Sequence, residues 1–485
     1  MTTNLIQARI DQILKFMTPA KLKFVNCHMV NYLTDDHWTN FIPKSIRDEV
    51  INGENDKTQE LLEKFMSSKE GYDADLDDFP HTKAFVEETQ NFTLAAMKEI
   101  CLDLTEFRKE MTKIGFHMTD EPPLKIKDFM SAKKNHEVEI TASLVNDLCK
   151  NIERISSEKP VIIDAGDGKG YLSSMLALQY GKFVLGIDAS EINTQGAEKR
   201  KQKMSRAWKT LVKKAKNEHN NASEKEITIE GNYRPVTQFI DERTDFVEMA
   251  QSNFEQPFET FFLSGLHTCG NLASNSIKIY QNNPKIRGLC NIGCCYHFLV
   301  EEFGEDVFVN EQKYTMNKDS IGFPLSSYVK KTKIFLGRNA RMHASQSLYR
   351  FFAEKSLPHQ TLHYRAMLQV LLERKFSTGE CSKWLVGKLK ATNFEEYVNQ
   401  SFDKFKQERP TKELIEEIEA NFNEKLVQLQ LFYILRLFLA PITESLIILD
   451  RLLFLREKGI EKSFIVELFD KVVSPRCYGI VSLKS

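Results

Sequence analysis

A glycine-rich segment stands between an apolar, β-branched run and a stretch with helical periodicity. It reads Asp164-Ala-Gly166-Asp-Gly168-Lys-Gly170-Tyr171-Leu172. Glycines at alternate positions allow a sharp turn and let a ligand approach the main chain without obstruction by Cβ atoms. Asp188 ends the next apolar run, eighteen residues after Gly170, where its acceptor-only carboxylate can hold both hydroxyls of a ribose. The pair predicts a nucleoside-binding site; the alternative is a structural turn beside a solvated aspartate.

The residue types in this segment distinguish between nucleoside ligands. The dinucleotide fingerprint G-x-G-x-x-G requires a small residue at its sixth position, which Tyr171 occupies, and no G-K-[ST] follows to hold a triphosphate. S-adenosylmethionine has no pyrophosphate and needs a close approach to the main chain instead. We therefore predict S-adenosylmethionine as the cofactor. Asp164 would accept from its ammonium group or organise the amides of the loop.

Histidine and cysteine residues follow two later apolar runs, in the segments His267-Thr-Cys269-Gly270 and Gly293-Cys294-Cys295-Tyr296-His297. Because the carboxyl ends of parallel strands meet at one edge of a sheet, both segments should lie beside the glycine loop. Methyl transfer needs an aligned acceptor lone pair and, for some acceptors, removal of its proton. Histidine changes charge near neutral pH, so His267 is the predicted base. Tyr296 would stack on the acceptor or orient it, with Cys269 and Cys294 facing it too. For Cys294 and Cys295 the alternative is inert packing.

These segments also contain residue types that bind metals. His267, Cys269, Cys290, Cys294, Cys295 and His297 lie within 31 residues of sequence. Their spacing, H-x-C followed by C-x₃-C-C-x-H, is not a standard zinc pattern. We predict no metal and leave zinc as the open alternative.

Short apolar runs indicate the strands that would position these residues. We expect strands over residues 161–163, 183–187, 260–264 and 286–292, with helices over 171–180 and 271–281. Strand-helix-strand units with right-handed crossovers predict an α/β, doubly wound sheet. Strands over 463–468 and 478–483 would complete it as an antiparallel pair. Further helices are expected over 346–355, 363–374, 414–439 and 443–456.

The length of 485 residues exceeds a single hydrophobic core. We predict a helical N-terminal unit over residues 1–125, a core domain over 126–300, a helical insertion over 301–440 and a C-terminal helix with a strand pair over 441–485. The most apolar stretch, 426–455, includes charged residues whose cost at bilayer depth argues against a membrane span. They are Arg436, Glu444, Asp450 and Arg451.

Charge is nearly balanced over the chain, with a formal net charge of −1, so a nucleic-acid site must be a local patch. Residues 199–216 contain nine basic side chains and no acidic one. They form either a solvated amphipathic helix or a surface that follows phosphates, which makes RNA a candidate partner. The odd number of cysteines, nine, argues for reduced thiols in the cytosol or nucleus. The basic N-terminal residues leave a mitochondrial transit peptide open.

Motifs along almost the whole chain resemble the methyltransferase-like protein 25 family, with its ribosomal-RNA-adenine-dimethylase-domain-containing relatives, among class I S-adenosylmethionine-dependent methyltransferases. Besides the glycine segment, the matching stretches are Met130-Ser-Ala-Lys133-Lys134-Asn-His136-Glu137-Val138, Gly265-Leu-His267-Thr-Cys269-Gly270-Asn-Leu272, Asn291-Ile-Gly293-Cys294-Cys295-Tyr296, Gly322-Phe-Pro-Leu-Ser-Ser-Tyr328, Tyr364-Arg365-Ala-Met-Leu-Gln-Val370, Leu449-Asp-Arg-Leu-Leu-Phe-Leu455 and Ser474-Pro475-Arg476.

This resemblance implies a class I sheet, S-adenosylmethionine as methyl donor, and a cofactor pocket that Lys133, His136 and Glu137 help to line. It favours RNA, ribosomal or transfer, as the acceptor. The histidine-cysteine segments also resemble loops of tRNA 2′-O-methyltransferases that act in the acceptor stem. Asp167 departs from the small or polar residue common in the family and should alter the local charge without altering the turn. A protein methyltransferase and a non-catalytic S-adenosylmethionine-binding scaffold remain as alternatives.

Overall fold

The computed structural model describes residues 2–484 except Glu54, residues 120–129, 220–232, 255–256, 305–319 and 377–383, Leu385 and Lys388. The side chains of Lys209 and residues 211–219 are also outside the described part.

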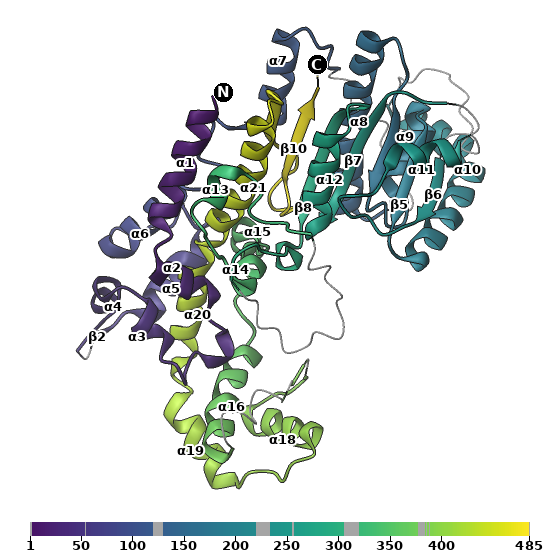
Figure 1. Cartoon of the computed structure of the whole chain (residues 1–485). Coiled ribbons are helices and arrows are strands. Elements are labelled where there is room, and N and C mark those ends of the chain that lie inside the picture. The colour runs from purple at the N-terminus through teal and green to yellow at the C-terminus, as the bar shows by residue number, and fades with distance from the viewer. Residues whose placement is uncertain are drawn as a thin grey trace.

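An eight-stranded sheet in the order β3-β9-β10-β8-β7-β4-β5-β6 organises the C-terminal and central parts of the chain (Figure 1). Strands β4 to β8 are parallel, β10 is antiparallel to both of its neighbours, and β3 pairs parallel with β9. The bounds are β3 Cys101–Asp103, β4 Val161–Ala165, β5 Val184–Asp188, β6 Tyr233–Thr237, β7 Phe261–Cys269, β8 Ile286–Cys294, β9 Lys462–Glu467 and β10 Tyr478–Leu483. The predicted α/β class with a Rossmann-like sheet is confirmed. Chain order reverses at β4, and this reversal places a crevice at the carboxyl ends of the strands.

Helices cover both faces of the sheet, so its central strands are apolar on both sides. In β4 every residue of Val-Ile-Ile-Asp-Ala is buried, as expected for a parallel strand. One face packs against α8 (Ala132–Ser156), α9 (Tyr171–Tyr180) and α10 (Glu191–His219). The other packs against α11 (Phe246–Asn253), α12 (Asn271–Asn282) and α21 (Ala440–Glu457).

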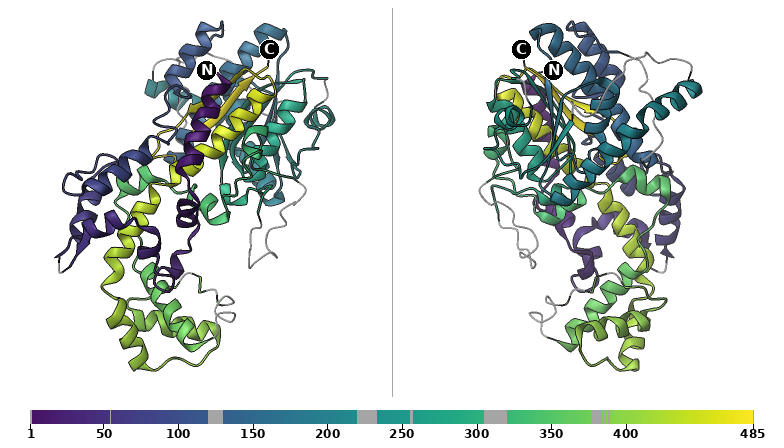
Figure 2. Two further views of the ribbon diagram at one scale, coloured as in Figure 1. Left: turned by 60° about the vertical axis from the view of Figure 1, so that its left-hand side comes forward. Right: turned by 90° about the vertical axis from the view of Figure 1, so that its right-hand side faces the viewer.

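The N-terminal helices share a hydrophobic core with the C-terminal part of the chain. Helix α1 packs along α21 and α5 packs along α20, and Figure 2 shows the purple α1 beside the yellow-green α21. Strand β3 belongs to this N-terminal part and extends the sheet at β9. The bounds are α1 Thr3–Phe16, α2 Pro19–Asn26, η1 Met29–Asn31, α3 His37–Phe41, α4 Lys44–Val50, β1 Ile51–Asn52, β2 Asn55–Asp56, α5 Thr58–Ser67, α6 Pro80–Gln90, α7 Leu104–Lys113 and α20 Lys425–Leu437.

Three helices, α16, α18 and α19, form a separate small core at the end of the molecule opposite both termini (Figure 1). Shorter elements connect them to the sheet. The bounds are η3 Tyr296–Phe298, α13 Ser327–Lys330, α14 Arg338–His343, α15 Leu348–Glu354, α16 Thr361–Lys375, α18 Phe394–Phe405 and α19 Lys412–Phe422.

Helices α20 and α21 follow each other so closely that Lys425–Glu457 forms one helical segment long and apolar enough to cross a membrane, with a mean hydropathy of 1.8 in its most apolar 18-residue window. However, 89% of that most apolar window is buried inside the protein. The expected boundary between residues 440 and 441 falls within this segment. Its apolar side chains are thus explained by packing against the N-terminal helices and the sheet.

Two features of the fold differ from expectation. Strand β6 was not predicted, because Pro235 interrupts its hydrogen-bonding pattern; the structure places it at a sheet edge, where proline is tolerated. The helix expected over 414–439 is two helices, since α19 ends at Phe422 and α20 begins at Lys425.

Candidate active site

A cavity of about 480 Å³ lies at the carboxyl edge of the sheet, within the size range of small-molecule sites. The loops after all five parallel strands β4 to β8 contribute to its walls. Four predicted site residues line it: Gly166, Asp188, His267 and Cys269. The other predicted site residues lie behind or beside these walls.

The glycine loop has the left-handed backbone that its sequence predicts. Gly166 has φ +80°, and a Cβ atom there would lie 2.9 Å from Leu272 Cδ2. Gly170 has φ +69°, and a Cβ atom there would lie 2.5 Å from the hydroxyl of Tyr233. Both positions therefore exclude a larger residue on conformational and steric grounds.

Asp188 ties this loop to the start of α10. Its Oδ2 accepts from the Gly168 amide at 3.0 Å, and its Oδ1 accepts from the Ser190 amide at 2.8 Å and from Asn193 Nδ2 at 3.1 Å. A carboxylate offers about four acceptor positions. Three are used within the protein, so one remains for a ligand hydroxyl unless a protein donor is displaced. The expected grip on both ribose hydroxyls does not fit this arrangement.

Asp164 lies beneath the loop and not in the cavity, with only 2% of its surface exposed. The Ser173 hydroxyl is 2.9 Å from Asp164 Oδ2 and 2.7 Å from Asp167 Oδ1, while the Tyr233 hydroxyl donates to Asp167. Burial, and for Asp164 also the neighbouring Asp167 charge, raises the pKa of both carboxyls. The two therefore act as a buried pair that supports the loop. Asp164 does not line the cavity, where it was expected to accept from the ammonium group, and its hydrogen bond comes from the Ser173 hydroxyl and not from a loop amide.

His267 faces the cavity and pairs with a buried carboxylate from α8. Its Nε2 is 2.9 Å from Glu137 Oε2, and the Ser474 hydroxyl donates to Glu137 Oε1 at 2.5 Å. Burial alone raises the pKa of Glu137. Hydrogen bonds from His267 and Ser474, together with the charges of His267 and Lys133, outweigh burial and bring this pKa below its usual value. Because a carboxylate only accepts, Nε2 of His267 carries the hydrogen. In the neutral imidazole the lone pair is therefore on Nδ1, which has no hydrogen-bond partner among the described residues.

Three cysteines lie together at the cavity wall. The sulfur atoms of Cys269, Cys294 and Cys295 are all within 4.8 Å of one another, and those of Cys269 and Cys294 are 3.1 Å apart. Cys269 is exposed, Cys295 is half-buried and Cys294 is buried. Hydrogen bonds from Cys269 and Cys294 lower the pKa of the Cys295 thiol, which makes it the favoured thiolate of the three.

Tyr296 does not face the acceptor side, contrary to expectation. Its side chain is 1% exposed, and its hydroxyl donates to Glu444 Oε1 of α21 at 2.8 Å. Arg476 donates to the same carboxylate oxygen at 2.5 Å. Burial raises the pKa of Tyr296 well above its usual value. The residue therefore fixes the loop after β8 against α21 and is not accessible to stack on a ligand.

The residues that the family resemblance assigned to the cofactor pocket, Lys133, His136 and Glu137, lie outside the cavity lining. His136 Nε2 accepts from the Asp470 amide at 3.2 Å, and the partly exposed Lys133 is 3.7 Å from Glu137 Oε1. The ring of Tyr171 lies between Lys134 Nζ, 4.6 Å from its centroid, and the Arg200 guanidinium, at 3.7 Å. None of these side chains lines the cavity.

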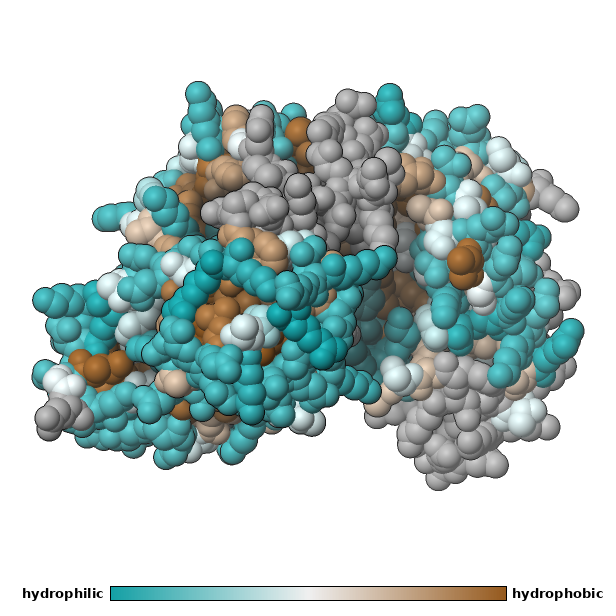
Figure 3. Space-filling model, turned by 90° about the horizontal axis from the view of Figure 1, so that it is seen from below, coloured by the Kyte–Doolittle hydropathy of each residue, from teal (hydrophilic) through white to brown (hydrophobic). Residues whose placement is uncertain are grey.

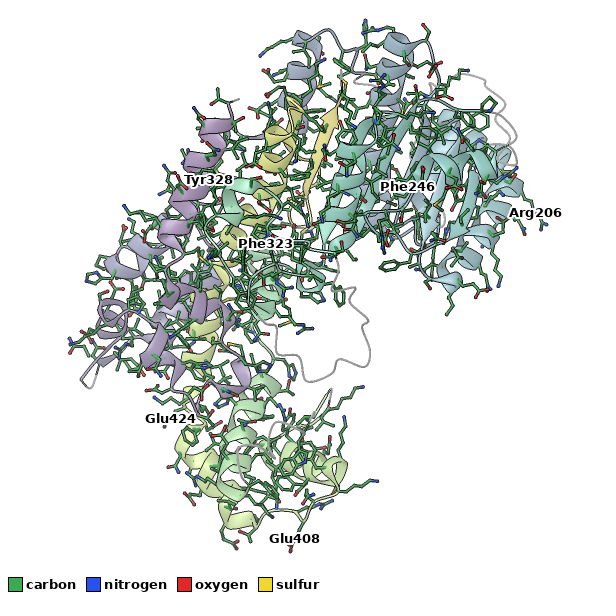
Figure 4. All side chains as sticks on the ribbon, in the orientation of Figure 1. Arg206, Phe246, Phe323, Tyr328, Glu408 and Glu424 are labelled. Atoms are coloured by element: carbon green, nitrogen blue, oxygen red, sulfur yellow. The ribbon has the colours of Figure 1, made fainter. Side chains whose placement is uncertain are left out.

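Helix α10 carries the basic stretch on the outer flank of the sheet, where Figure 4 shows Arg206 projecting away from the fold. Lys199, Lys203 and Arg206 line a surface hollow of about 360 Å³. On the inner face Met204 is 2% and Trp208 8% exposed. The described part of the helix is thus amphipathic, with Lys199, Lys203 and Arg206 exposed. Lys201 is 9% exposed and lies 3.4 Å from Glu198 Oε2. The side chains of residues 211–216 lie outside the described part.

Sequence reasoning missed several residues that line or hold the site. Phe239, 58% exposed, and Asp241 follow the unpredicted strand β6 and line the cavity. Buried Arg341 of α14 donates to the carbonyls of Tyr296, His297 and Leu299 and to Glu301 Oε2 at 2.8 Å. Recognition of β6 as an edge strand would have pointed to Phe239 and Asp241, because they follow the end of that strand. No local pattern indicates the role of Arg341, because its partners are 40 or more residues away.

Comparison with known proteins agrees with this architecture. A family described as a methyltransferase domain matches residues 133–302. The chain is 29% identical to a human protein named probable methyltransferase-like protein 25, over 99% of this chain and 97% of that protein. It is also 29% identical to the mouse protein of that name, over 74% of this chain and 76% of that protein. These matches confirm the resemblance that the motifs indicated.

Proposed function

We propose that this methyltransferase binds S-adenosylmethionine in the cavity at the carboxyl edge of its sheet and methylates RNA. The observation that carries the proposal is the convergence of Gly166, Asp188 and His267 on one cavity beside the reversal of strand order. Such crevices are the ligand sites of open α/β sheets.

The residues of the cavity suit a sulfonium nucleoside. Gly166 lines the cavity and has no Cβ atom to keep a ligand from its main chain, and Asp188 has one acceptor position left for a ribose hydroxyl. The exposed ring of Phe239 offers a stacking surface for a base, with the Asp241 carboxylate nearby in the same wall as an acceptor for an amino group. Together these contacts would hold a nucleoside at the walls formed by β4, β5 and β6.

The opposite wall, formed by β7, contains the group suited to proton removal. When bound, S-adenosylmethionine supplies an electrophilic methyl group on sulfur. Glu137 orients the imidazole of His267 so that the Nδ1 lone pair is free to take a proton from an acceptor hydroxyl or amine. A carboxylate behind a histidine fixes both its tautomer and its orientation.

Basic and aromatic side chains near the glycine loop support RNA as the acceptor. Lys134 and Arg200 flank Tyr171, and α10 continues this surface with Lys199, Lys203 and Arg206. Such surfaces bind nucleic acid through phosphate contacts with release of counterions. Seen from below, the surface is hollowed between the sheet, on the right of Figure 3, and the helical part on its left, which leaves an approach for a large acceptor.

The deciding experiment is transfer of a labelled methyl group from S-adenosylmethionine to fractionated lysate by the full chain. Label in RNA, abolished by RNase, supports the proposal. Label in protein would favour a protein methyltransferase, and no label with intact cofactor binding would favour a non-catalytic scaffold.

Removing two of the exposed cations of α10 should make RNA binding less sensitive to salt. Each phosphate contact on a single strand contributes about 0.7 to the slope of log affinity against log salt. For Lys199→Gln with Arg206→Gln, which removes two contacts, the magnitude of this slope should therefore decrease by about 1.4. Lys406→Gln with Lys425→Gln, two exposed cations of the helical part, is the matched control. An equal slope in both variants would contradict an RNA surface on α10.

Replacing Asp188 with alanine should weaken S-adenosylmethionine binding by about 10–100-fold. The change removes an acceptor from the ligand and also three hydrogen bonds that shape the loop; one hydrogen bond to a charged group contributes about 1.5–3 kcal/mol. Titration calorimetry measures the effect, with Asp245→Ala, an N-cap residue of α11 remote from the loop, as the control. Affinity equal to that of the unmodified chain would reject the assignment.

A further inference from the structure

The cysteine cluster at the cavity wall is built from two adjacent strands. Cys269 ends β7, Cys294 ends β8, and these two residues are direct partners in the parallel register. Cys295 follows immediately. The three sulfur atoms lie within 4.8 Å of one another, whereas tetrahedral zinc with sulfur at 2.3 Å places its thiolates roughly 3.8 Å apart. Small side-chain adjustments therefore convert this cluster into a three-thiolate site.

The backbone bends at two points to bring the sulfur atoms together. The register of β7 against β8 shifts between Leu266 and Thr268, so that His267 is an extra residue with φ +69°. Without this bulge Thr268, and not Cys269, would be the partner of Cys294. Cys295 has φ +34°, which breaks the alternation of the strand and lets its thiol join the other two. Left-handed non-glycine residues cost about 1–3 kcal/mol each and are concentrated at functional sites.

A buried positive charge adjoins the cluster. Arg451 of α21 is 2% exposed, and a Cβ atom at Gly293, next to Cys294, would lie 2.3 Å from its Nη1. Its Nε and Nη2 have no hydrogen-bond partner among the described residues. Asp450 and Glu444 oppose the effect of burial on the pKa of Arg451, but neither accepts a hydrogen bond from its Nε or Nη2. A divalent ion with three thiolates carries one net negative charge, which would complement Arg451.

We propose that Cys269, Cys294 and Cys295 bind one zinc ion as three thiolates, with the fourth coordination position directed toward the cavity. That direction follows from Cys269, the exposed member of the cluster, which lines the cavity. Binding releases the protons that these thiols still hold. A Cys269–Cys294 disulfide is the competing product, but it would require an oxidant and would leave the third thiol unused. The site does not depend on which cofactor or acceptor the cavity holds.

Zinc content of the purified full chain, kept reduced and free of chelator, tests the proposal. One zinc per chain is expected by mass spectrometry, falling to near zero in Cys269→Ser, Cys294→Ser and Cys295→Ser. Cys27→Ser, a half-buried cysteine of the N-terminal helical part, should keep its zinc. Arg451→Met should weaken zinc affinity by about 10–100-fold, as for other groups that support metal ligands. Replacement by cobalt should give the intense near-ultraviolet absorption of thiolate ligation.

A second measurement covers the case in which the serine variants fail to fold. Stepwise blocking of thiols in the unmodified chain with a mercurial should release one zinc, detected by an indicator dye, while circular dichroism is unchanged. The proposal is overturned by a zinc-free chain with three reactive thiols at these positions, by a disulfide seen as a mass 2 Da lower, or by zinc retained in all three serine variants. None of these readouts requires methyl transfer, so failure here is distinct from failure of the proposed function.

Discussion

Replacing His267 with glutamine should lower the rate constant for methyl transfer by about 10²–10⁴-fold, the usual contribution of a positioned general base. Affinity for S-adenosylmethionine should change little, because Asp188 and the glycine loop lie on the other walls of the cavity. Single-turnover transfer and calorimetry measure the two quantities. An undiminished rate in the variant would mean that the acceptor loses its proton elsewhere.

A substitution at Glu137, the carboxylate paired with His267, should give a smaller decrease in rate than the loss of His267 itself. Glu137→Gln keeps one oxygen that can accept from His267, replaces the oxygen that accepts from Ser474 with an amide donor, and removes the charge beside the imidazole. The rate should fall by less than in His267→Gln, and the dependence of rate on pH should change, which a purely structural role would not cause. His81→Gln, an exposed histidine of α6, should behave like the unmodified chain.

Replacing Arg341 with methionine should lower the free energy of unfolding by about 3–5 kcal/mol, the cost of breaking a buried ion pair by removal of one partner. Arg341 and Glu301 have side chains 0% and 2% exposed, and the change leaves the Glu301 carboxylate buried without its cation. The carbonyls of Tyr296, His297 and Leu299 also lose a donor. Denaturant unfolding measures the loss.

The pH dependence of this variant has a defined sign. Burial raises the pKa of Glu301, against the opposing effect of Arg341, so without the arginine the folded state holds a proton that the unfolded state releases. Stability of Arg341→Met should therefore fall as the pH rises above the ordinary range of glutamate. Arg350→Met, which breaks only the exposed pair with Glu354, should cost less than about 1 kcal/mol. Equal losses in the two variants would contradict the assigned role of Arg341.

The sheet and the position of the site could be predicted because local patterns determine them. Apolar β-branched runs identify buried parallel strands, as at Val161–Ala165, and closely spaced glycines identify a turn whose left-handed backbone other residues adopt only at a cost. The carboxyl edge then follows from topology alone. These steps correctly brought Asp188, His267 and Cys269 into one cavity.

Details of the site depended on contacts between segments far apart in sequence. Glu137 meets His267 across 130 residues, and Tyr296 is buried by a glutamate 148 residues later. Asp164 was assigned to the ligand from its place at the start of the glycine loop, but it lies buried beside Asp167, and both carboxyls are hydrogen-bonded to Ser173. A sequence pattern shows which residues share a strand end, but not which of them solvent can reach.

The helical segment Lys425–Glu457 has a practical consequence for any study of the isolated catalytic domain. Asp450 accepts from the amides of Leu325 and Ser326, and Glu444 holds Tyr296. A fragment truncated near residue 302, where the domain match ends, would lose these anchors together with β9 and β10. Strand β8 would then become an open edge with a large uncovered apolar surface, the situation that leads to aggregation. Recombinant work on this enzyme should therefore keep both ends of the polypeptide, since residues near the two termini jointly enclose the catalytic half.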